Sequence, residues 1–146
     1  MENTENFRLE RDLLGEKYVP AGAYYGVQTA RAMDNFHITG IPISHYPDLV
    51  RGLGMVKLAA ARGNHDCGIL SAEILKGIEG ACQELIEGEL HDQFQVDVLQ
   101  GGAGTSTNMN ANEVIANRAL ELMGHEKGHY AACDPHDHVN CSRQGT

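Results

Sequence analysis

The sequence predicts a mainly α-helical fold with an irregular N-terminal arm, and three observations support this prediction. Apolar residues recur at helical spacing in two segments after residue 46, and a third helical segment over residues 107–123 ends at a glycine. The first 46 residues hold frequent turn signals, with room for a small β-hairpin. A chain of 146 residues is long enough for one domain with a buried core.

Residues 1–46 form the predicted arm. Pro20-Ala21-Gly22 and Thr39-Gly40 are typical of turns, and a short helix fits only between residues 24 and 36. We therefore expect the regular part of the fold to begin after this arm.

The first long helix is predicted to begin at Pro47, because proline suits a first helical turn, and to fade over residues 63–68. Gly52 and Gly54 weaken it by roughly 1 kcal/mol each relative to alanine, so tertiary packing must hold it. The residues expected on its buried face recur every three or four positions: Leu49, Leu53, Val56 and Ala60.

The second helix has clear signals at both ends. Ser71 is a good N-cap, Leu70 can pack on Leu75, and Gly88 is placed to end the helix. Its expected buried stripe contains Ile74, Ile78, Cys82 and Leu85. Residues 93–99 then alternate between apolar and polar, which predicts a short extended segment with Phe94, Val96 and Val98 on one side.

The third helix, over residues 107–123 with Gly124 as its stop, contains four asparagines, although asparagine is a poor helix former. Asn108 and Asn112 share one face, Asn110, Glu113 and Asn117 share another, and the apolar stripe is formed by Ile115, Ala119 and Leu122. Such a helix is either well solvated or lines a polar site.

The loop over residues 100–107 precedes this helix and holds three glycines followed by three hydroxyl residues. Glycine lets a backbone approach a ligand closely, and the first amides of a helix favour an anion. The pattern indicates a cradle for a carboxylate or phosphate group; a flexible connector with a Ser or Thr N-cap is the alternative. A nucleotide loop is disfavoured, because neither a third glycine at the required spacing nor a Gly-Lys-Ser/Thr motif is present.

Charge and hydropathy limit the classes of partner that the chain is expected to bind. A net charge of −9 argues against nucleic acid and against an anionic membrane surface. No apolar run reaches the ~18 residues of a membrane helix, and the first residues lack the features of a secretory signal. We expect a cytoplasmic protein without disulfides.

Two segments contain residues of the types that bind metal ions. Residues 125–129 read His-Glu-x-x-His, but Gly124 and Gly128 bracket them, so the helical geometry of a zinc peptidase is not expected. Four potential ligands also gather over residues 133–141: Cys133, His136, His138 and Cys141. A polar loop with ordinary thiols is the favoured interpretation, and a small metal-binding module is the alternative. We predict no metal site and no cofactor.

The chain resembles the aspartase/fumarase superfamily along nearly all its length. Residues 7–15 read Phe-Arg-Leu-Glu-Arg-Asp-Leu-Leu-Gly, residues 24–29 read Tyr-Tyr-Gly-Val-Gln-Thr, and residues 101–114 match the first signature of the family. The Gly-Gly-Ala-Gly-Thr-Ser of residues 101–106 is similar to the ammonia-lyase branch, whereas class II fumarases usually carry Thr-Gly-Ser-Gly-Thr-Gln.

The resemblance implies reversible anti-elimination of ammonia from L-aspartate to give fumarate, through an aci-carboxylate intermediate and without an organic cofactor. A class II fumarase-type lyase is the alternative within the family. The chain corresponds to the N-terminal domain of that fold: residues 47–124 form its helical part, and residues 125–146 lead towards a central helical bundle that is absent. The full-length family is expected to be a homotetramer.

The resemblance also assigns the site. Thr105 matches a ligand of the substrate carboxylate, Gly104 and Ser106 shape its pocket, and Asn108 lines the same cleft. The next signature departs from the family after His138-Val139-Asn140: Thr146 retains a match if one residue is inserted there, and has none without a gap. Residues 134–137 lie where fumarases hold a second anion site. No catalytic residue is expected in this chain, because the serine base falls in the absent part, so the chain alone is expected to be inactive.

Overall fold

The computed structural model describes residues 6–35, 38–100 and 104–140 and is mainly helical, with one two-stranded sheet. The elements in chain order are β1 (Phe7–Asp12), β2 (Gly15–Pro20), α1 (Val27–Asn35), η1 (Ile43–His45), α2 (Pro47–Asp66), α3 (Ala72–Ile86), η2 (His91–Gln93), α4 (Thr105–Leu122) and η3 (Pro135–Val139), a short π-helix. The expected fold class, including the small hairpin, is confirmed.

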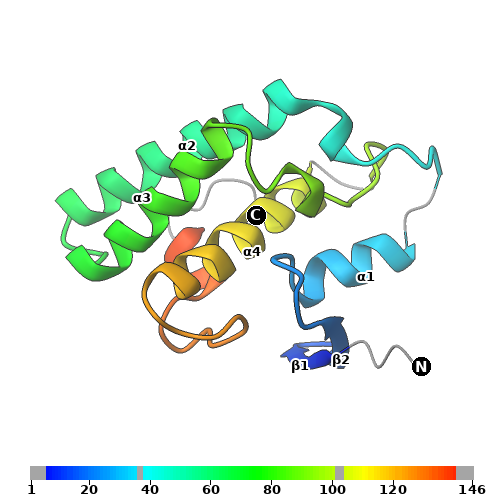
Figure 1. Cartoon of the computed structure of the whole chain (residues 1–146), viewed down its shortest axis with the longest axis horizontal. Coiled ribbons are helices and arrows are strands. Elements are labelled where there is room, and N and C mark those ends of the chain that lie inside the picture. Colours follow the sequence, from blue (N-terminus) through cyan, green and yellow to red (C-terminus); the bar gives the residue numbers. More distant parts are fainter. Residues whose placement is uncertain (1–5, 36–37, 101–103, 141–146) are drawn as a thin grey trace.

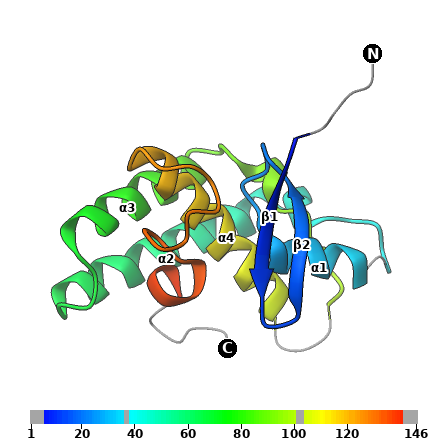
Figure 2. The same cartoon turned by 90° about the horizontal axis from the view of Figure 1, so that it is seen from below.

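The arm holds more regular structure than its turn signals predicted. Strands β1 and β2 pair antiparallel from Phe7 opposite Pro20 to Asp12 opposite Gly15, with Leu13 and Leu14 at the tip. Helix α1 follows within the segment where a short helix was expected. The hairpin and α1 lie together on one side of α4 (Figure 2).

Helices α2 and α3 form an antiparallel pair that packs over α4, the central helix of the molecule (Figure 1). Eleven of the eighteen residues of α4 are buried. Other elements therefore surround α4, and its asparagines lie in the protein interior.

The buried asparagines attach irregular segments to α4. Asn110 donates to the carbonyl of Gln93 (3.0 Å), and its Oδ1 accepts a long bond from the amide of Val96 (3.4 Å). Asn117 donates to the carbonyl of Tyr24 (2.7 Å) and accepts from the amide of Gly128 (2.8 Å). An amide side chain can satisfy both backbone groups of such a segment, which explains asparagine in a central helix.

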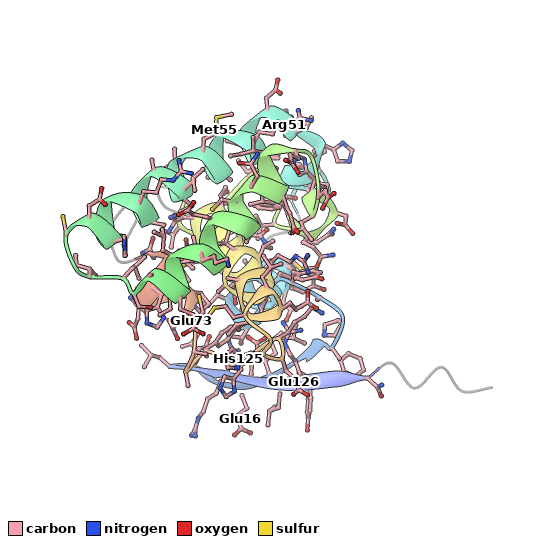
Figure 3. The ribbon with its side chains drawn as sticks, turned by 60° about the vertical axis from the view of Figure 1, so that its left-hand side comes forward. Glu16, Arg51, Met55, Glu73, His125 and Glu126 are labelled. Atoms are coloured by element: carbon pink, nitrogen blue, oxygen red, sulfur yellow. The ribbon has the colours of Figure 1, made fainter. Side chains whose placement is uncertain are left out.

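The predicted buried face of α2 is only partly correct: Leu53 is half-buried and packs against the core, but the most buried positions are others. Leu49 and Val56 are 45% and 49% exposed, and Met55 points outward from the helix (Figure 3). The buried residues are Val50, Gly54, Lys57, Ala61 and Asn64. The close approach of α3 explains the difference, since a Cβ on Gly54 would lie 3.1 Å from Cβ of Leu85.

Helix α3 agrees with its prediction. The Ser71 side chain accepts from the amide of Ile74, and Gly88 follows the helix with a φ of +98°. Ile78, Cys82 and Leu85 are fully buried. Local end signals and apolar spacing agree here, which is why sequence alone predicts the helix well.

Residues 93–99 form no strand, which corrects the extended prediction; one isolated bridge joins Asp97 to Pro42. Phe94 and Val96 are buried as expected, but Asp97, on the supposedly polar side, is only 5% exposed. Its carboxylate accepts from the Thr39 hydroxyl and from the amides of Thr39, Gly40 and Leu99, which compensates for its burial.

Within residues 6–35, 38–100 and 104–140, no helix is long and apolar enough to cross a membrane.

Candidate functional site

A cavity of about 500 Å³ lies beside the N-terminal half of α4. Three α4 residues four positions apart face it: Thr105, Met109 and Glu113. The remaining wall comes from the hairpin tip, the start of α1 and the segment around η3, and includes Arg11, Asp12, Leu13, Val27, Gln28, Tyr130, Asp134, Pro135, His136 and Asn140. Segments far apart in the sequence thus meet at the end of α4 that favours an anion.

The glycine-rich segment is shorter than the predicted loop over residues 100–107. Helix α4 begins at Thr105, so Thr105, Ser106 and Thr107 form its first turn and do not belong to the loop. Gly104 occupies the N-cap with a φ of +82°, a left-handed conformation that glycine adopts without strain, and it provides no side-chain cap.

Gln100 takes the place of the Ser or Thr cap that belonged to the alternative interpretation, a flexible connector. Its Oε1 accepts from the amide of Thr107 (3.0 Å), and its Nε2 donates to the Thr107 hydroxyl (2.6 Å). The Gln100 side chain thereby satisfies one of the unpaired amides in the first turn of α4. Residues 101–103, which hold two of the three predicted glycines, lie outside the described residues.

The structure separates the predicted site residues onto different faces of α4. Thr105 lines the 500 Å³ cavity, whereas Ser106 lines a second cavity of about 430 Å³ beside Asp12 and Arg31. Asn108 is turned towards the interior, and Gly104 is exposed at the helix start. The fifth predicted residue, Thr146, lies outside the described residues.

Lys57 of α2 is a polar residue of this region that the sequence analysis missed. It is 2% exposed, and its ammonium group donates to Oδ1 of Asn108 (2.6 Å) and, with a longer contact, to Oδ1 of Asn140 (3.3 Å). Burial lowers the pKa of the Lys57 ammonium group. The signal in the sequence was weak, because the apolar residues around Lys57 are spread over two faces of the helix.

Two buried carboxylates hold the start of α1. Glu113 accepts from the amide and hydroxyl of Thr29, each at 2.7 Å, and from the amide of Gln28 at 3.1 Å. Glu10 accepts from the amide of Val27 at 3.0 Å. Burial and, to a smaller extent, the nearby Glu10 raise the pKa of Glu113 to about 7 against the opposing effect of these hydrogen bonds.

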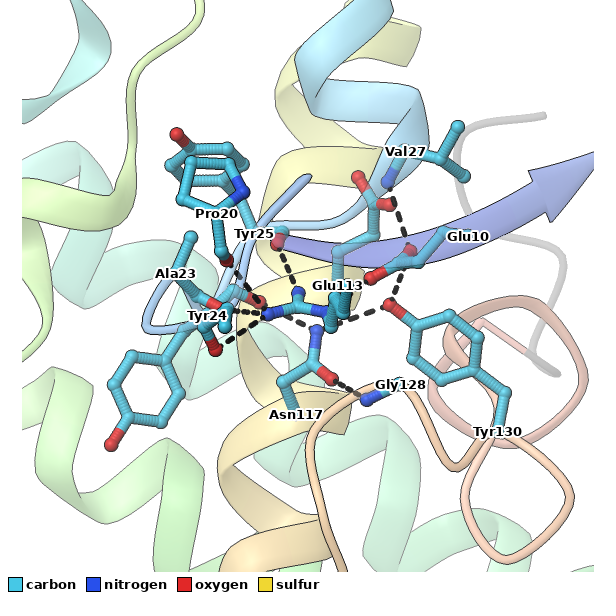
Figure 4. A network of polar contacts seen from close by, with 12 residues as sticks. Glu10, Pro20, Ala23, Tyr24, Tyr25, Val27, Glu113, Asn117, Gly128 and Tyr130 are labelled. Atoms are coloured by element: carbon cyan, nitrogen blue, oxygen red, sulfur yellow. Dashed lines mark hydrogen bonds and ion pairs between the residues drawn. The ribbon is translucent and has the colours of Figure 1, made fainter. Parts of the chain in front are cut away.

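The same network joins the hairpin to the segment after α4 (Figure 4). Tyr130 donates to Glu10 Oε1 (2.8 Å), while Arg8 pairs with Glu10 Oε2 (2.7 Å). The Arg8 guanidinium also donates to four backbone carbonyls, those of Pro20, Ala21, Ala23 and Tyr25. The wall of the cavity is therefore fixed by charge-assisted hydrogen bonds between four segments of the chain.

The comparisons with known proteins agree with the resemblance noted in the sequence. The model of the lyase family matches residues 15–145. This chain belongs to that family. It is 57% identical to the aspartate ammonia-lyase of Pseudomonas fluorescens over 143 residues. The alignment covers 98% of this chain and 30% of the relative. The aspartate ammonia-lyase of Escherichia coli (strain K12) is 54% identical over 138 residues, 94% of this chain and 29% of the relative.

Solved structures agree on the fold of this lyase chain. The native fumarate lyase:delta crystallin of Brucella melitensis superposes with a TM-score of 0.94 at 50% identity, over 96% of this chain and 33% of that one. The recombinant class II fumarase of Schistosoma mansoni gives a TM-score of 0.82 at 37% identity, over 92% of this chain and 28% of the fumarase. The present chain spans about 30% of the length of the curated relatives it matches.

The metal motifs form no metal centre in the part of the lyase chain that the structure describes, where no group of three or more His, Cys, Asp or Glu residues is placed to hold an ion. Residues 125–129 are not helical, as expected, and the rings of His125 and His129 stack at 5.1 Å. Burial raises the pKa of the Cys133 thiol to about 12, which disfavours a thiolate ligand. Cys141 lies outside the described residues.

Proposed function

We propose that this chain is the N-terminal, carboxylate-binding part of an aspartate ammonia-lyase, which interconverts L-aspartate with fumarate and ammonia. The identity of 54–58% to curated relatives of that name, over more than nine-tenths of the chain, carries the proposal. The class II fumarase structure is 37% identical and is the alternative. The Gly-Gly-Ala-Gly-Thr-Ser of residues 101–106 also favours the ammonia-lyase.

The proposed chemistry needs a site for a carboxylate whose charge grows during the reaction. Removal of the C3 proton places a second negative charge on the adjacent carboxylate, giving the aci-carboxylate, and ammonia then leaves from the opposite face. Hydrogen-bond donors held in position before the reaction stabilise such a charge most effectively. The start of α4 supports this role, because its first amides and the Thr105 hydroxyl lie at the positive end of the helix dipole.

Thr105 is the proposed substrate ligand, with Gly104 and Ser106 shaping the turn that presents it. Asn108 contributes through the interior hydrogen bonds of that turn, and Thr146 is retained as a proposed ligand from the resemblance alone. We assign no catalytic residue to this chain, because the proposed serine base belongs to a region that the 146 residues do not include.

The 146-residue chain by itself is therefore expected to show no lyase activity. Purified chain is mixed with L-aspartate, and fumarate formation is followed by its ultraviolet absorbance. No enzyme-dependent increase is expected, whereas sustained turnover would show that these residues already contain a complete catalytic site.

A segment exchange tests the proposed function itself. Residues 1–146 replace the matching segment of the Pseudomonas fluorescens aspartate ammonia-lyase, and in parallel that of the Schistosoma mansoni class II fumarase. We expect activity on L-aspartate in the first host and poor activity on L-malate in the second. Restored L-malate activity together with an inactive first host would favour the fumarase alternative.

We further infer that the complete enzyme works in the cytoplasm as a homotetramer. The outer face of α2 supports assembly, because Leu49, Met55 and Val56 are each about half exposed in the single chain. Sedimentation of the exchanged enzyme measures the assembly, and a monomer that retains full activity would contradict it.

A further inference from the structure

Among the residues that the structure describes, Lys57 is a buried cation with no carboxylate paired to it. Three groups from other elements face its ammonium group: the thiol of Cys82 on α3 and the side-chain amides of Asn108 on α4 and of Asn140 just after η3. Burial raises the pKa of the Cys82 thiol to about 12, so this neighbour is neutral. No ion pair joins Lys57 to a carboxylate in residues 6–35, 38–100 and 104–140.

The ammonium group fixes the orientation of both amides. Since it can only donate hydrogen bonds, the atoms that face it must be the Oδ1 oxygens of Asn108 and Asn140. Oδ1 of Asn140 also accepts from Nδ2 of Asn108 at 3.1 Å. The acceptor of Asn140 is thus used twice, and its Nδ2 group is the part left for other partners.

Asn140 lines the 500 Å³ cavity that also holds Thr105, and it is 6% exposed. Its Nδ2 group has no described acceptor within the protein. We propose that Asn140 Nδ2 is a second carboxylate donor of this cavity, and that Lys57 is the positioning residue that orients it. The inference rests on the proposed function, because it assigns a further group to the same carboxylate site.

A ligand-free experiment tests the positioning. The side-chain amide resonances of Asn108 and Asn140 are recorded by two-dimensional NMR of the ¹⁵N-labelled chain and of Lys57→Met. Both resonances are expected to move in the variant, because their oxygens lose the ammonium donor. The control Lys76→Met removes an exposed lysine of α3 and should leave them unchanged. Unchanged Asn140 resonances in Lys57→Met would overturn the positioning.

Asn140→Asp separates a donor to the ligand from a residue that only maintains the fold. The new carboxylate can still accept from Lys57 and Asn108, so the variant is expected to remain folded even where Lys57→Met is not. It lacks the Nδ2 donor and brings a negative charge to the cavity, so fumarate affinity should fall about tenfold or more. Unchanged affinity in a folded Asn140→Asp would overturn the donor role.

Titration of the wild-type chain with fumarate distinguishes the two proposals. If the resonances of the Thr105 amide and of Asn140 Nδ2 both shift and saturate at the same fumarate concentration, the result supports the proposed function and the present inference. A shift at Thr105 without one at Asn140 overturns the present inference and leaves the proposed function standing. A shift at Asn140 alone counts against Thr105 as the ligand, and the absence of both contradicts both proposals.

Discussion

At the scale of single residues, Glu113 shows how a buried carboxyl group can serve the fold. It is 2% exposed and accepts three hydrogen bonds from the first turn of α1, so it replaces water for groups that a helix start leaves unpaired. Its pKa of about 7 lies above the ordinary value of 4.5, which makes the stability of the chain depend on pH.

Glu113 is expected to make the chain less stable as pH rises from about 4.5 to about 7, because the unfolded chain loses this proton first. Complete titration of the group corresponds to about 3 kcal/mol in the free energy of unfolding. Urea unfolding at several pH values measures the free energy of unfolding of wild type and of Glu113→Gln. The difference between the two free energies should change between about pH 4.5 and about pH 7. A difference that does not depend on pH would contradict this role of Glu113.

Gly26 is the second residue-scale test, since its missing side chain makes room for this network. A Cβ there would lie 2.2 Å from Oε2 of Glu113 and 2.7 Å from the hydroxyl of Tyr130. Gly26→Ala should destabilise the chain by on the order of 3 kcal/mol or prevent folding. Gly22→Ala, in open space, is the control and should change thermal stability little; equal effects of both would refute the packing argument.

The sequence predicted part of this chemistry. The spacing of Asn110, Glu113 and Asn117 placed them on one face of a helix, and all three are buried. Their partners lie 11 to 93 positions away and include backbone groups of irregular segments, which no local pattern specifies. Lys57 was missed for the same reason, because its partners come from α4 and from the residue after η3.

At the scale of elements, capping and composition predicted helices better than they predicted which face packs. The prediction for α3 was correct in both helix ends and in the buried stripe. The prediction for α2 was correct in its start at Pro47. The buried face of α2 depends on how closely α3 approaches Gly54, which is a tertiary effect.

Two glycines of α2 test this explanation. Gly52 has open space beside it, so Gly52→Ala should raise the free energy of unfolding by about 0.5–1 kcal/mol. At Gly54 a new Cβ would press against Leu85 and the Cys82 carbonyl, which outweighs the gain in helix propensity. Gly54→Ala should therefore lower the free energy of unfolding by on the order of 1 kcal/mol. Urea unfolding followed by circular dichroism measures both. A stabilising Gly54→Ala would contradict the close packing of α2 on α3.

At the scale of the whole molecule, we propose that the chain carries one side of a substrate site. The cavity beside α4 collects Thr105, Asn140 and the hairpin tip, while the relatives are about three times as long as this chain. Sequence motifs therefore predicted the family and a helix directly after the glycine-rich segment. They could not predict that Thr105 and Ser106 line different cavities, because the packing of α1 and the hairpin decides this.

The central claim is that the first turn of α4 binds the substrate carboxylate through Thr105. The most direct measurement is the rate of fumarate formation from L-aspartate by the exchanged Pseudomonas fluorescens enzyme, with Thr105 or with Thr105→Val. We expect activity with threonine and a loss of kcat/KM of roughly 100-fold or more with valine, in an enzyme of unchanged stability. Equal kcat/KM for the two enzymes would contradict it.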